Sequence, residues 1–117
     1  FKAILLLRKI IVNNKITHIH SHSSSVFFAI FLKLFCPYIK IIWHDHYGKS
    51  EMLNQRPVLP LKIASLFISQ VIAVNQKLKT WAKDKLYCRN VIYLPNFISI
   101  SNSMESWWIL KTMILKF

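Results

Sequence analysis

The five histidines of this chain are grouped at two points in the sequence. His18, His20 and His22 alternate along a run that also contains isoleucine and threonine, and His44 and His46 follow a second apolar run. Alternate residues of a strand point to the same face, so each group places its imidazoles on one side of a strand. An imidazole can exchange a proton near neutral pH, hydrogen-bond to a hydroxyl group or bind a metal ion. The spacing predicts a polar site at the ends of two strands.

The polar stretch 44–56 surrounds the second pair of histidines and is predicted to be a loop. Asp45 can act beside the imidazoles as a hydrogen-bond acceptor, and Gly48, the only glycine of the chain, allows a sharp bend. Lys49 and Arg56 supply positive charge for an anionic group. Two structural alternatives stay open. The stretch 44–56 could be an ordinary solvated loop, and the strand histidines could simply hydrogen-bond to structural partners.

A metal site is another chemistry that these spacings allow. Zinc and manganese hydrolases use histidines spaced as in residues 18–22, and a His-Asp-His run as in residues 44–46. The acids near the histidines are Asp45 and Glu51, and the ends of the later predicted strands offer no further ligand. A His-rich metal-dependent hydrolase is therefore a less favoured alternative, and no residue is predicted as a metal ligand.

Apolar periodicity predicts that helices and strands alternate along the chain. The predicted helices are 1–12, 26–35, 57–69 and 76–86, and the predicted strands are 16–22, 39–43, 71–74 and 91–94. This alternation is typical of parallel sheets, so the predicted fold class is α/β, a Rossmann-like parallel sheet with helices on both faces. Ligands of such sheets bind beyond the carboxyl ends of the strands, where His22 and His44 are expected to lie.

Length and composition exclude several classes of protein. The chain has 117 residues, enough for one domain, and its hydrophobic content of 54% excludes a disordered tail. A single glycine excludes a P-loop and a dinucleotide-binding fingerprint, because both need several glycines. The two cysteines, Cys36 and Cys88, cannot form a disulfide framework and indicate a reducing compartment. No apolar run reaches the roughly 18 residues of a membrane span.

Positive charge dominates the sequence. Sixteen Lys and Arg residues against four Asp and Glu residues give a net charge of +12, with the histidines neutral. The densest basic group lies on the predicted helix 76–86 and just after it (Lys77, Lys79, Lys83, Lys85 and Arg89). Such a helix could rest on an anionic membrane surface or simply be solvated, so a noncatalytic basic membrane-surface module is the alternative function. Nucleic acid is not expected as a partner, because only three of the sixteen cations are Arg.

Four of the predicted strands, with the residues that follow them, resemble a known family. The runs Ile-Thr-His-Ile-His-Ser-His (16–22), Ile-Ile-Trp-His-Asp-His (41–46), Val-Ile-Ala-Val-Asn (71–75) and Val-Ile-Tyr-Leu-Pro-Asn (91–96) resemble, in this order, the N-terminal domain of family 4-like glycosyltransferases. The resemblance covers about residues 1–98. It departs from the family at Phe97, where members carry glycine, and residues 99–117 form an atypical C-terminal tail.

The resemblance implies one half of a GT-B fold, in which two Rossmann-like domains face each other across a cleft. The N-terminal domain of such enzymes mainly holds the acceptor, and the other domain holds the nucleotide-sugar donor. Members retain the anomeric configuration and need no metal, so no cofactor is expected beyond that donor. His44 matches the position that contacts the donor sugar or the reacting hydroxyl, and His22 matches a rim position. Asp45, His46, Lys49 and Arg56 are the expected substrate-binding residues around it.

The family's first strand with its Gly-rich turn, and its whole donor domain, have no counterpart in the printed sequence. The chain is therefore expected to be a truncated hexosyltransferase-type domain of polysaccharide biosynthesis that transfers no sugar alone. The expected partners are a glycan or lipid-linked acceptor and an anionic membrane surface. The expected location is the cytoplasm, with peripheral attachment to the inner face of the cell membrane.

Overall fold

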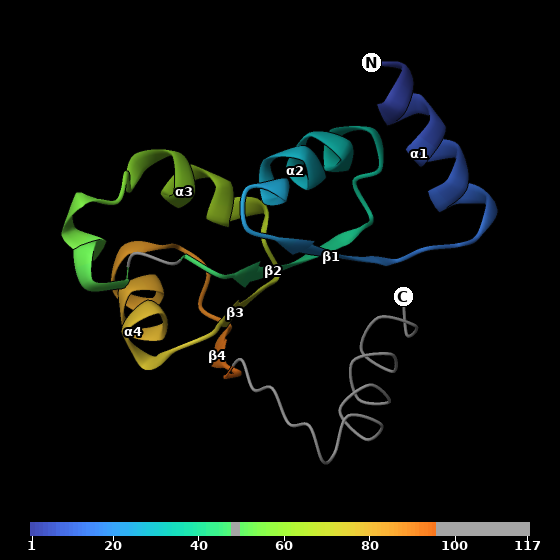
Figure 1. Ribbon diagram of the computed structural model, residues 1–117. Coiled ribbons are helices and arrows are strands. Elements are labelled where there is room, and N and C mark those ends of the chain that lie inside the picture. The colour runs from blue at the N-terminus through green and yellow to red at the C-terminus, as the bar shows by residue number, and fades with distance from the viewer. Residues whose placement is uncertain (48–49, 96–117) are drawn as a thin grey trace, which may run out of the picture.

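A computed structural model describes residues 1–47 and 50–95, without the side chains of Ser50 and Glu51 (Figure 1). Gly48, Lys49, the expected domain boundary after residue 98 and the expected tail 99–117 lie outside the described residues. The elements follow one another in the order α1 (Lys2–Asn13), β1 (His18–His22), α2 (Ser25–Phe35), β2 (Lys40–Asp45), η1 (Ser50–Gln55), α3 (Leu59–Ala64), η2 (Ser65–Phe67), β3 (Gln70–Ala73), α4 (Gln76–Lys85) and β4 (Val91–Tyr93).

The strands form one parallel sheet in the order β1-β2-β3-β4. Each strand pairs with the strand that follows it in the sequence, and helical residues connect each pair, as parallel pairing requires. The predicted fold class, an α/β Rossmann-like parallel sheet flanked by helices, is confirmed. The register places His22 directly opposite His44 on the neighbouring strand.

The main core lies between the sheet and the helices that follow its strands. Ile41, Trp43 and Val71 point from β2 and β3 into a cluster with buried residues of α2, α3 and α4 (Val26, Ala29, Leu61, Trp81 and Ala82 among them). A second cluster joins α1 to α2 through Ile4, Ile11, Leu32, Cys36 and Ile39. Because side chains alternate along a strand, the neighbours of Ile41 and Trp43 face the other way, and these include His44.

Local signals explain where most elements begin and end. The side chain of Asn75 accepts a hydrogen bond of 2.8 Å from the Leu78 backbone N–H and caps α4. Pro60 lies in the first turn of α3, where a missing N–H costs nothing. The side-chain amide of Asn14 donates to the Ile10 carbonyl at 2.8 Å at the end of α1. Pro37 follows α2 closely and prevents the helix from continuing.

Two of the predicted boundaries are wrong. The single helix predicted over 57–69 is a short α-helix, α3, followed by one 3₁₀ turn, η2, and it ends at Phe67. Ser65 lies at this change: its hydroxyl donates to the Lys62 carbonyl at 2.6 Å and accepts the Tyr87 N–H at 2.9 Å. A serine hydroxyl that bonds to the preceding turn weakens a continuous α-helix, which accounts for the tighter turn.

Strand β2 continues through Asp45, whereas the sequence predicts a loop from residue 44 onwards. His44 pairs with His22 on one side and with Ile72 on the other, and Asp45 pairs with Ala73. A polar His-Asp pair is uncommon in a central strand, so composition alone indicates a loop. The strand continues because β1 and β3, on either side of β2, supply hydrogen-bond partners for its backbone groups. His44 therefore lies within the sheet.

Candidate functional site

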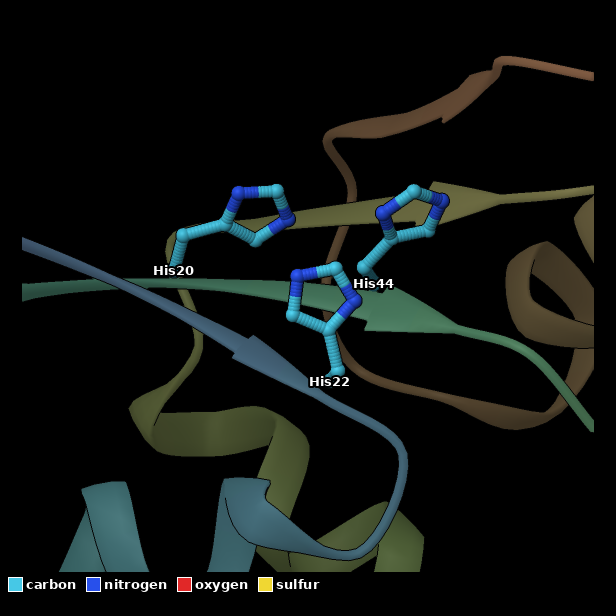
Figure 2. Close-up of side chains that lie close together, drawn as sticks. All are labelled: His20, His22 and His44. Carbon is cyan, nitrogen blue, oxygen red and sulfur yellow. The ribbon is translucent and has the colours of Figure 1, made fainter. Parts of the chain in front are cut away.

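The two groups of histidines come together into one cluster on a single face of the sheet. His20 and His22 lie on β1, His44 lies on β2 opposite His22, and His46 follows β2. The ring centroids are 4.5 Å apart for His20 and His22, 5.1 Å for His22 and His44, and 4.0 Å for His44 and His46. Figure 2 shows the first three rings on the same side of the two strands. We call these four residues the histidine cluster.

His46 and His18 have different hydrogen-bond partners. The Nε2 atom of His46 lies 3.0 Å from the Nδ1 atom of His22, so the two rings share a hydrogen bond whose donor depends on their tautomers. His18, at the start of β1, has its Nδ1 atom 2.8 Å from the Thr17 hydroxyl. The sequence correctly predicts that the histidines of each group share a face. One ring nitrogen each of His20, His22 and His44 lies within 4.8 Å of the others, and His18 is not a member of this group.

Several ring nitrogens of the cluster are buried without a hydrogen-bond partner. Among the described residues, neither nitrogen of His44 has a partner, and the same holds for Nε2 of His20. His44 is only 6% exposed. Leaving a buried polar group unpaired costs about 1–3 kcal/mol. Binding of a further group to these nitrogens would therefore be favourable.

Burial also favours the neutral form of three members of the cluster, His20, His22 and His44. Desolvation, together with the smaller effects of the charges of His46, His22 and His20, lowers the pKa of His44 to about 4. Desolvation is also the main cause that lowers the pKa of His20 and of His22. Neutral imidazoles keep one lone pair on each ring, so at neutral pH these side chains can accept a hydrogen bond or coordinate a metal ion.

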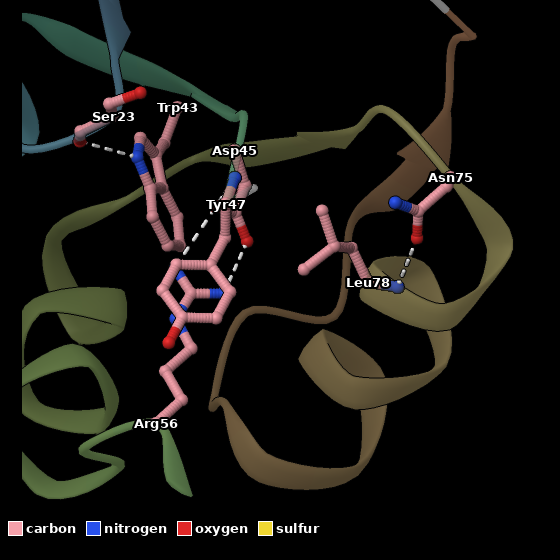
Figure 3. A network of polar contacts seen from close by, with 7 residues as sticks. All are labelled: Ser23, Trp43, Asp45, Tyr47, Arg56, Asn75 and Leu78. Atoms are coloured by element: carbon pink, nitrogen blue, oxygen red, sulfur yellow. Dashed lines mark hydrogen bonds and ion pairs between the residues drawn. The ribbon is translucent and has the colours of Figure 1, made fainter. Parts of the chain in front are cut away.

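Asp45 and Arg56 form a buried ion pair away from the histidine cluster. The guanidinium of Arg56 donates to both carboxylate oxygens of Asp45, at 2.7 and 3.0 Å, and the Tyr47 backbone N–H donates to the same carboxylate at 3.2 Å (Figure 3). The Arg56 guanidinium also lies over the rings of Tyr47 and Trp81, 4.2 and 4.4 Å from their centroids. Asp45, predicted as a hydrogen-bond acceptor for substrate, and Arg56, predicted as a cation for an anionic group, therefore bind each other.

The residue pattern does not predict this ion pair, although one signal in the sequence points to it. Asp45 ends a strand of buried residues, and a buried carboxylate needs a cation or several N–H donors. The cation comes from only 11 positions further along the chain. Lys49, the other predicted cation, lies outside the described residues.

A cleft of about 570 Å³ opens where β2 ends, between the beginnings of α2 and α3. Its walls are largely aromatic or aliphatic, with a few polar groups (Ser23, Ser24, Phe27, Trp43, Asp45, His46, Tyr47, Arg56, Pro57, Pro60 and Leu61). His46 belongs to this wall and contacts His22, so it connects the cleft with the histidine cluster. His22 and His44 do not line the cleft.

The turn between β1 and α2 forms one rim of the cleft and is held by two hydrogen bonds. Ser23 has a positive φ of 50°, a conformation that residues other than glycine rarely adopt. Its N–H donates to the His44 carbonyl at 3.1 Å, and its carbonyl accepts the Trp43 indole N–H at 2.9 Å. These bonds fix the end of β1, and with it His22, against β2.

The outer surfaces of α1, α2 and α3 expose large apolar side chains. These helices lie beside one another, with α2 between the other two (Figure 1). We call the exposed apolar residues of these helices, together with Leu66 of η2 just after α3, the helix layer (Leu5, Leu6, Ile10, Phe28, Phe31, Leu34, Ile63 and Leu66). No acidic residue occurs at positions 1–44 or 52–83, whereas Lys2, Lys9 and Lys62 lie on α1 and α3. Within the described part of the chain, no helix has the length and apolarity needed to cross a bilayer.

Comparison with known protein families and with curated proteins finds no match for this chain. The resemblance to family 4-like glycosyltransferases therefore stays a prediction from its four sequence runs. The chemistry of the histidine cluster and the cleft is what supports a function.

Proposed function

We propose that this chain is the acceptor-binding half of a retaining glycosyltransferase and transfers no sugar alone. The observation that carries the proposal is His44: a buried, neutral imidazole near the carboxyl end of a central parallel strand, in contact with His46 on the wall of a cleft. Ligands of open α/β sheets bind at this edge. The four sequence runs that resemble family 4-like glycosyltransferases include this histidine.

His44 would act on the reacting groups from behind the wall of the cleft, which it contacts through His46. Its unpaired ring nitrogens can accept a hydrogen bond from an acceptor hydroxyl or donate one to the donor sugar. The acceptor hydroxyl would displace the nucleoside diphosphate from the sugar, and a second domain would hold that donor. His46 and His22 share a hydrogen bond beside His44, which restricts the positions of both rings.

The cleft is suited to the sugar or lipid part of an acceptor. Its volume of about 570 Å³ lies within the usual range of small-molecule sites. Phe27, Trp43 and Tyr47 line it and supply aromatic surface for a sugar ring or an acyl chain. Arg56 also lines the cleft, but its guanidinium is bound to Asp45, so we assign it to positioning rather than to an anionic substrate.

An anionic membrane surface is the partner that the helix layer favours. Its apolar side chains, together with Lys2, Lys9 and Lys62, form the combination that binds acidic headgroups and the acyl boundary. We therefore place the membrane contact on α1–α3 rather than on the basic helix α4, at the inner face of the cell membrane. This surface equally supports the second candidate function, a noncatalytic membrane-binding module.

Ligand titration of the purified chain, followed by nuclear magnetic resonance, tests the proposal. Alkyl glycosides should shift the signals of His46, Tyr47 and Trp43, because these residues line the cleft. Nucleotide sugars should be neither bound nor consumed. Turnover of a nucleotide sugar by the chain alone would contradict the proposal, and a chain that binds anionic vesicles but no glycoside would favour the second candidate.

A further inference from the structure

The histidine cluster has the arrangement of a three-histidine metal site. His20 and His22 form a His-x-His pair on β1, and His44 lies on β2 directly opposite His22. One ring nitrogen from each of the three lies within 4.8 Å of the other two. We propose that His20, His22 and His44 bind one zinc ion.

The distances are compatible with closure around an ion. Zinc–nitrogen bonds of about 2.0–2.1 Å place the nitrogens of a tetrahedral site roughly 3.3 Å apart. The rings must therefore approach one another by about 1.5 Å at most from their separation of up to 4.8 Å. This approach would have to come from rotation about the side-chain torsions, because the pairing of β1 with β2 fixes the three backbone positions.

The unpaired nitrogens make a ligand at this position favourable. His44 is almost completely buried, and within the described ranges both of its nitrogens, and Nε2 of His20, lack hydrogen-bond partners. A bound ion would occupy a lone pair on each of these two rings. His46 adds an outer contact: its bond to Nδ1 of His22 orients that ring and leaves Nε2 of His22 for the ion.

The chemistry of the three ligand side chains selects the class of metal. Three imidazoles suit Zn²⁺ and its transition-metal neighbours, whereas Mg²⁺ and Ca²⁺ require oxygen ligands. The nearest carboxylate in sequence, Asp45, is bound to Arg56, so the cluster supplies nitrogen ligands. A water molecule would take the fourth position. A lone pair that binds zinc cannot contact a sugar, so zinc would inhibit the function proposed for His44.

Zinc binding by the full chain is tested by calorimetry with zinc chloride and by the visible spectrum of the cobalt-substituted protein. We expect one ion per chain and a tetrahedral cobalt spectrum. His22→Gln should weaken binding by more than about tenfold, because a ligand is lost. His22 is exposed, so this variant leaves the core intact. His18→Gln is the matched control, since it removes a histidine of the same strand that does not belong to the three-nitrogen group, and it should bind zinc like the parent.

The variant His46→Gln tests whether His46 orients the ring of His22 or binds the zinc ion itself. It should weaken zinc binding and leave the tetrahedral cobalt spectrum in place, whereas His22→Gln should abolish that spectrum. Absence of zinc binding by the parent chain would overturn the proposal, and so would equal losses in His18→Gln and His22→Gln. The measurement needs no sugar and no turnover, so failure of the glycosyltransferase proposal would leave its outcome unchanged.

Discussion

Asp45 is a carboxylate that is only 1% exposed, and Arg56 holds it with two short hydrogen bonds. Removing one partner from such a pair leaves a buried charge without compensation, which costs more than the intact pair contributes. The pair fixes the chain after β2, and with it Tyr47 and one wall of the cleft. Stability should therefore depend strongly on either residue.

Arg56→Met should lower the free energy of unfolding by about 3–5 kcal/mol, because Asp45 loses its buried cation. The double variant with Asp45→Asn should recover part of that loss, since no buried charge remains. Urea denaturation of the parent, both single variants and the double variant measures this coupling. Arg89→Ala changes an exposed arginine and serves as the control. Additive losses in the double variant would contradict a direct pair.

Acid should destabilise the folded chain through His44. In the unfolded chain His44 protonates near its ordinary pKa of 6.5, but in the folded chain it does so only near pH 4. As the pH falls through this window, the unfolded state binds a proton that the folded state does not, so the free energy of unfolding decreases. The loss from this residue reaches at most about 3 kcal/mol and is complete below the folded-state pKa.

Urea denaturation at a series of pH values, with a chelator present, measures this effect. His44→Gln should flatten the decrease between pH 6.5 and about 4. The remaining slope in His44→Gln comes from His20 and His22, whose pKa values are also lowered by burial. An identical slope in the parent and in His44→Gln would show that this residue does not titrate as described.

At the scale of elements, the beginning of α4 depends on one side chain. Asn75 accepts the Leu78 N–H, which otherwise has no acceptor within the helix. Asn75→Ala should lower the free energy of unfolding by about 1 kcal/mol, and Asn75→Asp should keep the cap. Thermal denaturation of the two variants beside the parent measures the difference. Equal melting temperatures for the alanine and aspartate variants would show that the cap contributes nothing.

The elements themselves follow closely from local sequence. Helix and strand order, the cap at Asn75 and the end of α1 near Asn14 depend on residues a few positions apart, so periodicity and capping rules predict them. The extension of β2 through His44 and Asp45 depends on pairing with residues 22 and 73, which local patterns do not contain. The 3₁₀ turn after α3 depends partly on Tyr87, for the same reason.

At the scale of the whole molecule, the helix layer should decide where the chain meets a membrane. Phe28→Ser with Leu34→Ser should strongly reduce binding to vesicles that contain anionic lipid, because both side chains are exposed on α2. Met52→Ser removes an exposed apolar residue elsewhere and should have little effect. Vesicle sedimentation with and without anionic lipid, at low and high salt, measures the binding.

Charge variants assign the contact to one side of the molecule. Lys2→Glu with Lys9→Glu should weaken vesicle binding, since both lie on α1, and Lys83→Glu with Lys85→Glu on α4 should weaken it less. The reverse order would place the contact on α4, as the sequence alone suggests. Self-association of the parent chain that Phe28→Ser abolishes, without vesicle binding, would identify a second copy as the occupant of the helix layer.

The alternation of helices and strands, the parallel sheet and the faces shared by histidines of the same strand can all be predicted from the sequence. These features arise from period-2 and helical patterns that each segment carries locally. That the two histidine groups form one cluster, and that Arg56 binds Asp45, is visible only in the folded chain. Both features depend on the register and packing of segments that are distant in sequence, so no local pattern encodes them. In the low dielectric of the interior, such polar contacts carry large free energies. The helix layer also depends on packing. Helix α2 has apolar residues on all sides, so the position of the sheet decides which of them are buried and which are exposed.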